Sequence, residues 1–191
     1  ELNVWYLDDG TLAGDSASVL SDFAQIIHES RKIGLEINPS KCELHFMSDT
    51  DEEVLKRFQL LSPGIRSITK DNLTLLGAPL TSKAAMCCLN TKLEEMKILF
   101  ARLPSLNSYH IAFYLLRHCF AIPRLTYLLR TTPTWNFEEI LHSFDTEIRS
   151  TLETLLNTTL SEQKWILASL PVNVGGLGVR KASDLAIPAF L

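Results

Sequence analysis

Two adjacent carboxylates, Asp8 and Asp9, follow an apolar run at residues 4–7 of this 191-residue chain. The pattern predicts that the run forms a strand, that Asp9-Gly10 makes a tight hairpin turn, and that residues 11–13 return as the second strand. Two like charges held side by side repel one another, and a divalent cation bound between them relieves that repulsion. The pair therefore indicates a hairpin tip suited to hold Mg²⁺ ions for phosphoryl transfer by a two-metal mechanism.

A purely structural interpretation of the same residues stays open at this point. Asp-Gly is a common turn dipeptide, and a second Asp in front of it can simply be solvated. A metal-dependent phosphohydrolase is a further alternative, although no other Asp, Glu or His stands at ligand spacing near the hairpin. The surrounding sequence is needed to choose between these interpretations.

The segment after the hairpin would hold the hairpin in place. Asp15 and Ser16 can cap a helix whose apolar side chains recur at helical spacing as far as Ile33. Gly34 is typical of the C-terminal end of such a helix. We expect the apolar face of this helix to pack beneath the sheet and to cover the hairpin.

Short strands and a short helix are predicted to follow. Residues 35–37 and 42–47 are expected to form two strands. Thr50 begins a capping-box pattern for a short helix. Residues 65–68 and 73–76 are expected to pair as a hairpin, so the first part of the chain has an α+β pattern.

From Ser82 onward the pattern is almost entirely helical. Apolar stripes at helical spacing predict a helix bundle. Ser108, Asn136 and Ser161 are expected to begin individual helices, and Asp184 can cap the last one. Three tyrosines of this region are expected in the core rather than at a base-stacking surface: Tyr109, Tyr114 and Tyr127.

The charge changes sign along the chain. Residues 1–53 carry 3 basic and 12 acidic side chains, residues 54–135 carry 11 and 3, and residues 136–191 carry 4 and 7, which gives the net charge of −4. An acidic segment that holds cations, followed by a basic segment that contacts phosphates, suits a nucleic-acid enzyme. Solvation of helices by scattered Lys and Arg is the alternative. The four cysteines show neither CxxC pairing nor zinc-ligand spacing, which favours reduced thiols.

Four motifs, in the same order along the chain, resemble those of reverse transcriptases, in particular of non-LTR retrotransposons. Tyr6-Leu7-Asp8-Asp9 resembles the Tyr-x-Asp-Asp box, and residues 34–41 resemble the Gly-Leu-x-x-Asn-x-x-Lys segment of the palm. Leu76-Gly77-Ala78-Pro79-Leu80 is similar to the primer grip. Residues 168–171 (Ala-Ser-Leu-Pro) and 175–180 (Gly-Gly-Leu-Gly-Val-Arg) resemble a segment found downstream of the thumb.

The resemblance implies an α+β fold with three parts. Residues 1–81 would form the C-terminal part of a polymerase palm, made of the Asp-Asp hairpin, a helix and short antiparallel strands. Residues 82–160 would form a helical thumb, and residues 161–191 a connection-like segment. The parent protein would be an RNA-directed DNA polymerase that uses two Mg²⁺ ions, an RNA template, a DNA primer and deoxynucleoside triphosphates.

The site residues follow from the same resemblance. Asp8 and Asp9 would be the catalytic metal ligands, and Lys41 would protonate the departing pyrophosphate. The residues expected beside the primer and template are Tyr6, Leu76, Gly77, Ala78, Pro79 and Leu80. The basic side chains expected to contact the nucleic-acid backbone from the thumb are Lys83, Lys92, Lys97, Arg102, Arg117, Arg124 and Arg130.

Reverse transcriptases carry a further catalytic Asp and a nucleotide-selecting motif ahead of the Asp-Asp hairpin, whereas the hairpin here begins at residue 4. We therefore expect a fragment that does not polymerise on its own. The alternative is a decayed or domesticated retroelement remnant that acts as a noncatalytic nucleic-acid-binding or interaction module. No apolar run is long enough to span a bilayer and no targeting signal is visible, so we expect no membrane partner and an intracellular location, in the cytoplasm or nucleus.

Overall fold

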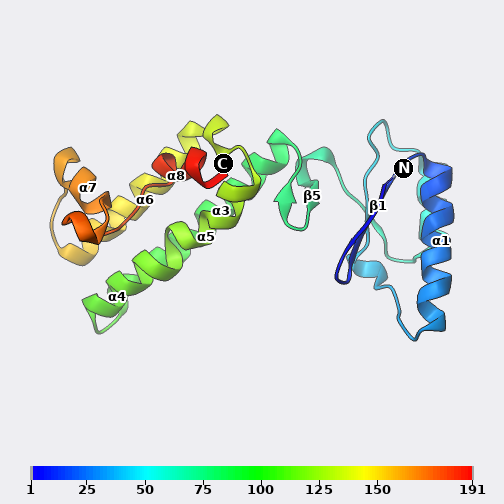
Figure 1. The fold of residues 1–191 in the computed structure, drawn as a ribbon, viewed down its shortest axis with the longest axis horizontal. Coiled ribbons are helices and arrows are strands. Elements are labelled where there is room, and N and C mark those ends of the chain that lie inside the picture. Colours follow the sequence, from blue (N-terminus) through cyan, green and yellow to red (C-terminus); the bar gives the residue numbers. More distant parts are fainter. Residues whose placement is uncertain (1, 191) are drawn as a thin grey trace. The chain divides into compact units, whose positions relative to one another are not determined.

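The computed structural model describes residues 2–190 and divides the chain into two compact units, Glu1–Leu76 and Gly77–Leu191 (Figure 1). Strands lie mainly in the first unit, and the second is mostly helical. The predicted mixture of α and β structure, with a helical second part, is thus confirmed at the level of secondary structure. Among residues 2–190, no helix is both long and apolar enough to cross a membrane.

The first unit contains a hairpin, two helices and several very short strands. Its helices are α1 (Ser16–Lys32) and α2 (Glu52–Leu61). Its strands are β1 (Leu2–Tyr6), β2 (Asp9–Ala13), β3 (Glu43–Leu44), β4 (Arg66–Ser67) and β5 (Thr74–Leu75). Single 3-10 turns lie at Pro39–Lys41 and Lys70–Asn72.

The hairpin turns at Leu7-Asp8, so the prediction of a turn at Asp9-Gly10 is wrong. β1 and β2 pair antiparallel, and the last pair before the turn is Tyr6 with Asp9. Leu7 takes the left-handed backbone conformation that the turn needs, with φ of 56°. Gly10 lies opposite Trp5, and a Cβ at Gly10 would stand 2.6 Å from the indole ring. The glycine therefore makes room for a cross-strand aromatic side chain, which a turn-dipeptide rule does not consider.

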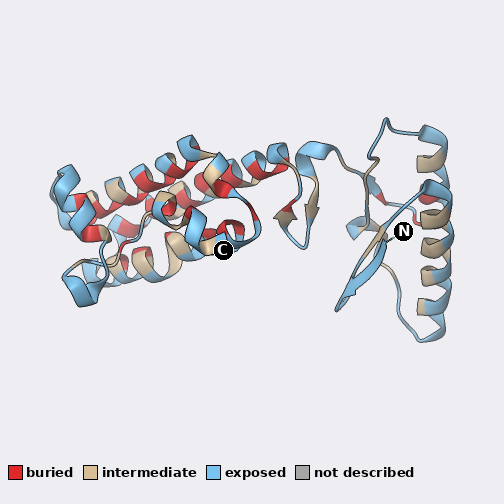
Figure 2. Cartoon of the chain, turned by 45° about the horizontal axis from the view of Figure 1, so that its top comes forward, coloured by how far each residue is buried: buried red, intermediate tan, exposed pale blue. Residues whose placement is uncertain are grey.

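α1 packs against β2 and against α2, whereas β1 stays exposed, so the helix covers only one strand of the hairpin rather than the whole hairpin as predicted. Asp15 caps it by accepting hydrogen bonds from the backbone N–H groups of Ala17 and Ser18, at 3.1 and 3.0 Å. Gly34 follows its last turn with φ of 79°, as expected of a helix end. No residue of α1 is fully buried, and Figure 2 shows the first unit mostly in the colours of exposed and intermediate residues.

Two strand predictions in this unit are wrong. Residues 35–37 form no strand, because the N–H of Leu35 is used by Ser30 O to close the end of α1. β4 pairs in parallel with β3 rather than antiparallel with residues 73–76, since the N–H groups of Arg66 and Ile68 donate to the carbonyls of Cys42 and Leu44. The expectation of antiparallel strands therefore holds for the first hairpin and fails for the β3–β4 pair.

The second unit begins with the short strand β6 (Ala78–Pro79) and continues as helices. These are α3 (Ser82–Phe100), α4 (Tyr109–Leu115), a π-helical turn at Leu116–Phe120, α5 (Ile122–Thr131), α6 (Glu138–Leu156), α7 (Glu162–Ser169) and α8 (Ala182–Phe190). Single 3-10 turns lie at Leu103–Ser105, Thr134–Asn136 and Val172–Val174. α3, α5, α6 and α8 enclose one apolar core, drawn in red in Figure 2.

The predicted helix starts at Ser108 and Ser161 are confirmed, because both hydroxyls accept backbone N–H groups. Asn136 is not a cap, since it lies in a 3-10 turn and α6 begins after Phe137 without a side-chain cap. The prediction of buried tyrosines is also wrong. The exposed fractions are 64% for Tyr109, 59% for Tyr114 and 49% for Tyr127.

A carboxylate from α6 caps α8 across the core. Asp145 Oδ1 accepts the N–H of Ala182 at 2.5 Å, and Oδ2 accepts the hydroxyl and the N–H of Ser183 at 2.5 and 3.3 Å. Burial raises the pKa of Asp145, and the hydrogen bonds from Ser183 and Ala182 oppose that shift. Asp184, the predicted cap, lies inside the first turn of α8 instead. The capping group therefore comes from 37 residues earlier in the chain.

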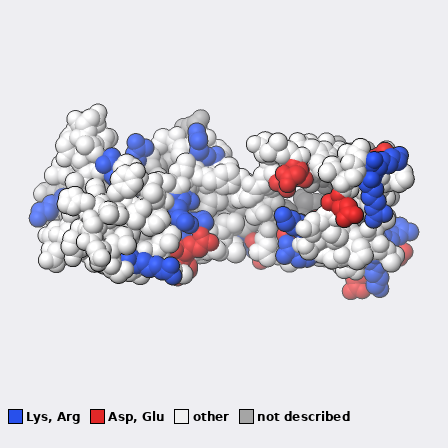
Figure 3. All heavy atoms as spheres, turned by 90° about the horizontal axis from the view of Figure 1, so that it is seen from below, with Lys and Arg blue, Asp and Glu red and all other residues white. Residues whose placement is uncertain are grey.

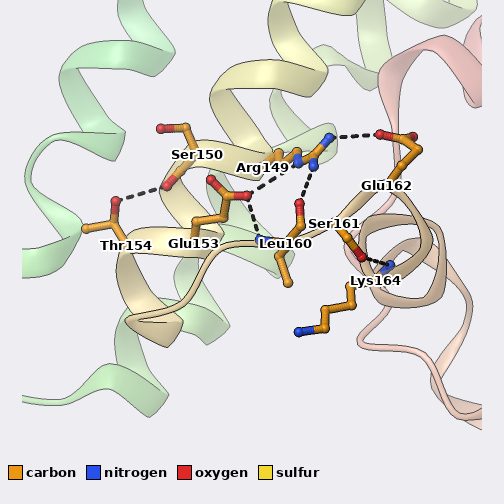
Figure 4. Close-up of polar contacts among 8 residues, drawn as sticks. All are labelled: Arg149, Ser150, Glu153, Thr154, Leu160, Ser161, Glu162 and Lys164. Carbon is orange, nitrogen blue, oxygen red and sulfur yellow. Dashed lines mark hydrogen bonds and ion pairs between the residues drawn. The ribbon is translucent and has the colours of Figure 1, made fainter.

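A second polar cluster fixes the connection between α6 and α7 (Figure 4). The Arg149 guanidinium donates to Glu162 Oε2 at 2.9 Å and to the carbonyl of Leu160, and its Nε lies 3.4 Å from Glu153 Oε1. Glu153 in turn accepts the backbone N–H of Leu160 at 2.8 Å. The connection is thus held by hydrogen bonds from both flanking helices.

Candidate metal-binding hairpin and basic surface

Asp8 and Asp9 stand at the tip of the β1–β2 hairpin. Asp8 is in the turn, and Asp9 is the first residue of β2, directly opposite Tyr6. Both carboxylates are exposed, and no hydrogen bond or ion pair within residues 2–190 engages either side chain. The carboxylate oxygens are therefore open to ligands from solvent.

The hairpin behind the tip is ordered by local contacts. Trp5 covers Gly10, and its indole N–H donates to Asn3 Oδ1 at 2.8 Å. α1 supports β2 from one side. The tip and β1 therefore stay exposed to a ligand or a partner.

The carboxylate oxygens at the tip are of the type that binds Mg²⁺. Carboxylate oxygens are hard ligands, and Mg²⁺ is commonly bound through one or two carboxylates together with water and substrate phosphates. No group of three or more His, Cys, Asp or Glu side chains within residues 2–190 could by itself hold a metal ion. Asp8 and Asp9 would thus supply part of a coordination shell, completed by groups that these residues do not contain.

Lys41 ends the 3-10 turn that follows Asn38. Asn38 orders this turn by accepting hydrogen bonds from the N–H and the hydroxyl of Ser40, at 3.1 and 2.8 Å. The Lys41 side chain is exposed, and among residues 2–190 no hydrogen bond or ion pair joins it to Asp8 or Asp9. Its predicted role toward pyrophosphate stays a prediction.

The residues predicted at the primer surround a tight turn. Leu76 and Gly77 both have left-handed backbones, with φ of 50° and 78°. Pro79 is buried in the helical unit, where β6 contacts α3 and α5. Leu76 and Leu80 are 49% and 56% exposed, and Ala78 is half-buried. Tyr6, the remaining member of this predicted set, is 62% exposed beside Asp9.

The predicted thumb cations differ in what surrounds them. Lys92 and Lys97 are paired with Glu95 and Glu94 on the same helix, at 2.7 and 2.8 Å. The hydrogen bond from Lys92 lowers the pKa of Glu95, and the hydrogen bond to Glu94 raises the pKa of Lys97. The others are Lys83, Arg102, Arg124 and Arg130, which are exposed, and Arg117, which is half-buried. On the face drawn in Figure 3, basic side chains are scattered over the helical unit rather than gathered in one strip.

One of these cations lies in a cleft that sequence analysis did not anticipate. Arg117 and His118, from the π-helical turn, line it together with Gly178 and Arg180, and its volume is about 460 Å³. A Cβ at Gly178 would lie 2.9 Å from Nε, Cζ and Nη2 of Arg117. The only signal for this juxtaposition in the sequence is the glycine-rich segment before Arg180.

The chain is similar to a retroelement protein. Over 95 residues it is 28% identical to the retrotransposable element SLACS 132 kDa protein of Trypanosoma brucei gambiense. The matched stretch covers 50% of this chain but only 8% of the length of that relative. No protein-family model and no solved structure matches the chain. This similarity connects the chain with retroelements.

Proposed function

We propose that this chain is part of a retroelement reverse transcriptase, an RNA-directed DNA polymerase, and that it carries the Asp-Asp hairpin of the palm and the helical thumb. The observation that carries the proposal is the exposed Asp8-Asp9 pair at the tip of a hairpin whose sequence is Tyr-Leu-Asp-Asp. The similarity of half of the chain to a retrotransposable element protein agrees with the proposal.

The exposure of the hairpin is a second support. Val4, Trp5 and Tyr6 are 51%, 47% and 62% exposed, although large apolar side chains of a strand are usually covered. An isolated two-stranded hairpin is marginally stable in water. A palm sheet that continues beyond β1 and β2 would bury these side chains and fix the two carboxylates.

In this function Asp8 and Asp9 would hold Mg²⁺, which supplies electrostatic stabilisation to phosphoryl transfer when bound. Tyr6 would lie beside the primer–template junction, next to Asp9 across the hairpin. Leu76 to Leu80 would position the primer end through backbone and apolar contacts. The exposed Lys41 ammonium would donate a proton to the leaving pyrophosphate.

The test is primer extension by the product of the complete natural reading frame, on an RNA template with deoxynucleoside triphosphates and Mg²⁺. We expect Asp8→Asn and Asp9→Asn to reduce extension at least 100-fold, while Asp49→Asn, an exposed carboxylate of the same unit, leaves it unchanged. Extension by the wild type that survives both hairpin substitutions would refute the assignment. Residues 1–191 alone are expected to show none.

A metal titration tests the tip without relying on activity. Mn²⁺ added to the isotope-labelled chain should broaden the backbone signals of residues 6–10 first, because a paramagnetic ion relaxes nearby nuclei. The effect should disappear in the Asp8→Asn/Asp9→Asn double variant and persist in Asp49→Asn.

A noncatalytic nucleic-acid-binding module from a retroelement is the second candidate. The exposed tyrosines of the helical unit and its basic cleft favour it, since neither depends on the hairpin. Salt-sensitive RNA binding that is unchanged in the Asp8→Asn/Asp9→Asn variant, with no extension by the complete protein, would select this candidate.

A further inference from the structure

The cleft at the π-helical turn is cationic. Arg117 and His118 come from one segment and Arg180 from another, 63 residues after Arg117, and no Asp or Glu lines the cleft. Arg117 and Arg180 form no ion pair or hydrogen bond within residues 2–190, in contrast to Arg149 in the same unit. Two guanidinium groups without carboxylate partners therefore face one cavity, and an anion with several oxygen acceptors would satisfy them.

Gly178 lies directly against Arg117 in this cleft. The guanidinium rests against the glycine so closely that any side chain there would displace it. The glycine backbone is left-handed, with φ of 69°, and its N–H donates to the carbonyl of Leu170 at 2.8 Å. The glycine thus lets the Arg117 guanidinium approach the backbone of this segment, and Arg180 follows two residues later.

An exposed aromatic pair adjoins the cleft. His118 lines the cleft, and its ring centroid lies 4.7 Å from that of Tyr114, with an angle of 36° between the planes. Tyr114 is 59% exposed, although a tyrosine of a helix bundle is usually packed. Cationic groups beside exposed aromatic rings are typical of surfaces that bind single-stranded nucleic acid, where phosphates meet the cations and unpaired bases stack.

We propose that this cleft binds one nucleotide of a single-stranded nucleic acid, with its phosphodiester between Arg117 and Arg180 and its base against the Tyr114–His118 pair. The ligand class rests on the proposed function, whereas the site itself rests on the geometry of the helical unit. A duplex cannot use the aromatic pair in this way, because its bases are already stacked and paired. The site would therefore prefer single strands over a duplex of the same length.

The experiment measures binding of the full chain to fluorescein-labelled 12-nucleotide oligo(U), oligo(dT) and a blunt RNA–DNA duplex by fluorescence anisotropy at several salt concentrations. Arg117→Gln and Arg180→Gln should each weaken single-strand binding and reduce the slope of log K against log salt by about 0.7. Tyr114→Ala should weaken it about five-fold or more and leave the salt slope unchanged.

Two controls separate the site from general charge and from misfolding. Lys164→Gln removes one exposed charge from the same unit, and Figure 4 shows the Lys164 ammonium outside the hydrogen-bonded cluster, so it should change affinity less than two-fold. Arg117→Lys keeps the charge and most of the side-chain stem but loses the two-pronged donor, so it should bind between wild type and Arg117→Gln. Circular dichroism checks the helical content of each variant.

Equal affinities of Arg117→Gln, Arg180→Gln and Lys164→Gln for single strands would overturn the site while leaving the proposed function in place, provided the wild type binds nucleic acid. A wild type that binds none of the three nucleic acids would overturn the site, whereas the proposed function is tested separately by primer extension with the complete protein. Displacement of oligo(U) by millimolar inorganic phosphate with no effect of Tyr114→Ala would reduce the site to a phosphate site and refute the base contact.

Discussion

The buried carboxylate that caps α8 gives a prediction whose size follows from the structure. Asp145→Ala removes the acceptor for the N–H of Ala182, which is fully buried, and for the N–H and hydroxyl of Ser183. A buried donor left without a partner costs about 1–3 kcal/mol. The desolvation that raises the pKa of Asp145 already offsets part of the gain from these bonds, so we take about 2 kcal/mol as the net loss.

Thermal unfolding followed by circular dichroism at 222 nm measures this loss. For a unit of this size 1 kcal/mol corresponds to roughly 3–6 °C, so the Tm of the helical unit should fall by roughly 6–12 °C. Asp184→Ala is the matched control, because Asp184 is an exposed carboxylate in the first turn of the same helix and should cost less than about 0.5 kcal/mol. A Tm of Asp145→Ala equal to that of Asp184→Ala would refute the role of Asp145 as the cap.

The same carboxylate predicts a pH dependence of stability. Its pKa is raised in the folded state, so the folded chain binds its proton more tightly than the unfolded chain does. Its contribution to stability is therefore fully present below the ordinary pKa of 3.8 and falls as the pH rises through the raised value. Asp145→Asn does not titrate, so the stability of the wild type relative to this variant should decrease from pH 3 to pH 7 in urea unfolding. A difference that grows over this range would show that the sign is wrong.

Three further substitutions test other contacts. Gly10→Val would place its Cβ 2.6 Å from the Trp5 ring, so we expect a shift in Trp fluorescence and loss of the hairpin signals in NMR. Arg149→Gln should destabilise the helical unit by about 1–2 kcal/mol in urea, because the carbonyl and carboxylates that it joins lose a charged donor, whereas Lys164→Gln should have no effect. Lys97→Gln should change the Tm by less than 2 °C, since an exposed ion pair contributes little. An effect as large as that of Arg149→Gln would contradict this.

Helix caps and amphipathic helices could be predicted from the sequence, because they depend on residues that are close together in the chain. The capping role of Asp15 and the helix start at Ser108 follow from side chains that bond within their own first turn. The amphipathic helix that packs against β2 follows from the spacing of its apolar residues. Such interactions span three or four positions, so a single sequence contains all that determines them.

Contacts between distant segments could not be predicted from such local patterns. The parallel pairing of β3 with β4 joins residues 23 apart, and the cleft joins Arg117 with Arg180. The prediction of the turn at Asp9-Gly10 is wrong because the glycine is required by the Trp5 ring on the opposite strand and not by a turn conformation of its own backbone. The aspartates themselves were found from their types alone, whereas their position in the turn depends on that cross-strand packing.

The small core of the first unit affects how its hairpin can respond to ligands. Among residues 2–76 the buried side chains are Phe58, Ser62 and Ile65, so little free energy separates the ordered unit from locally opened forms. Two kinds of ligand would bind the ordered form: a cation at Asp8 and Asp9, and a protein surface that packs over the exposed side chains of the hairpin. Each would then raise the affinity for the other by the same factor, even without touching it. Cation affinity measured on this chain alone would thus be a lower limit to that of the covered hairpin.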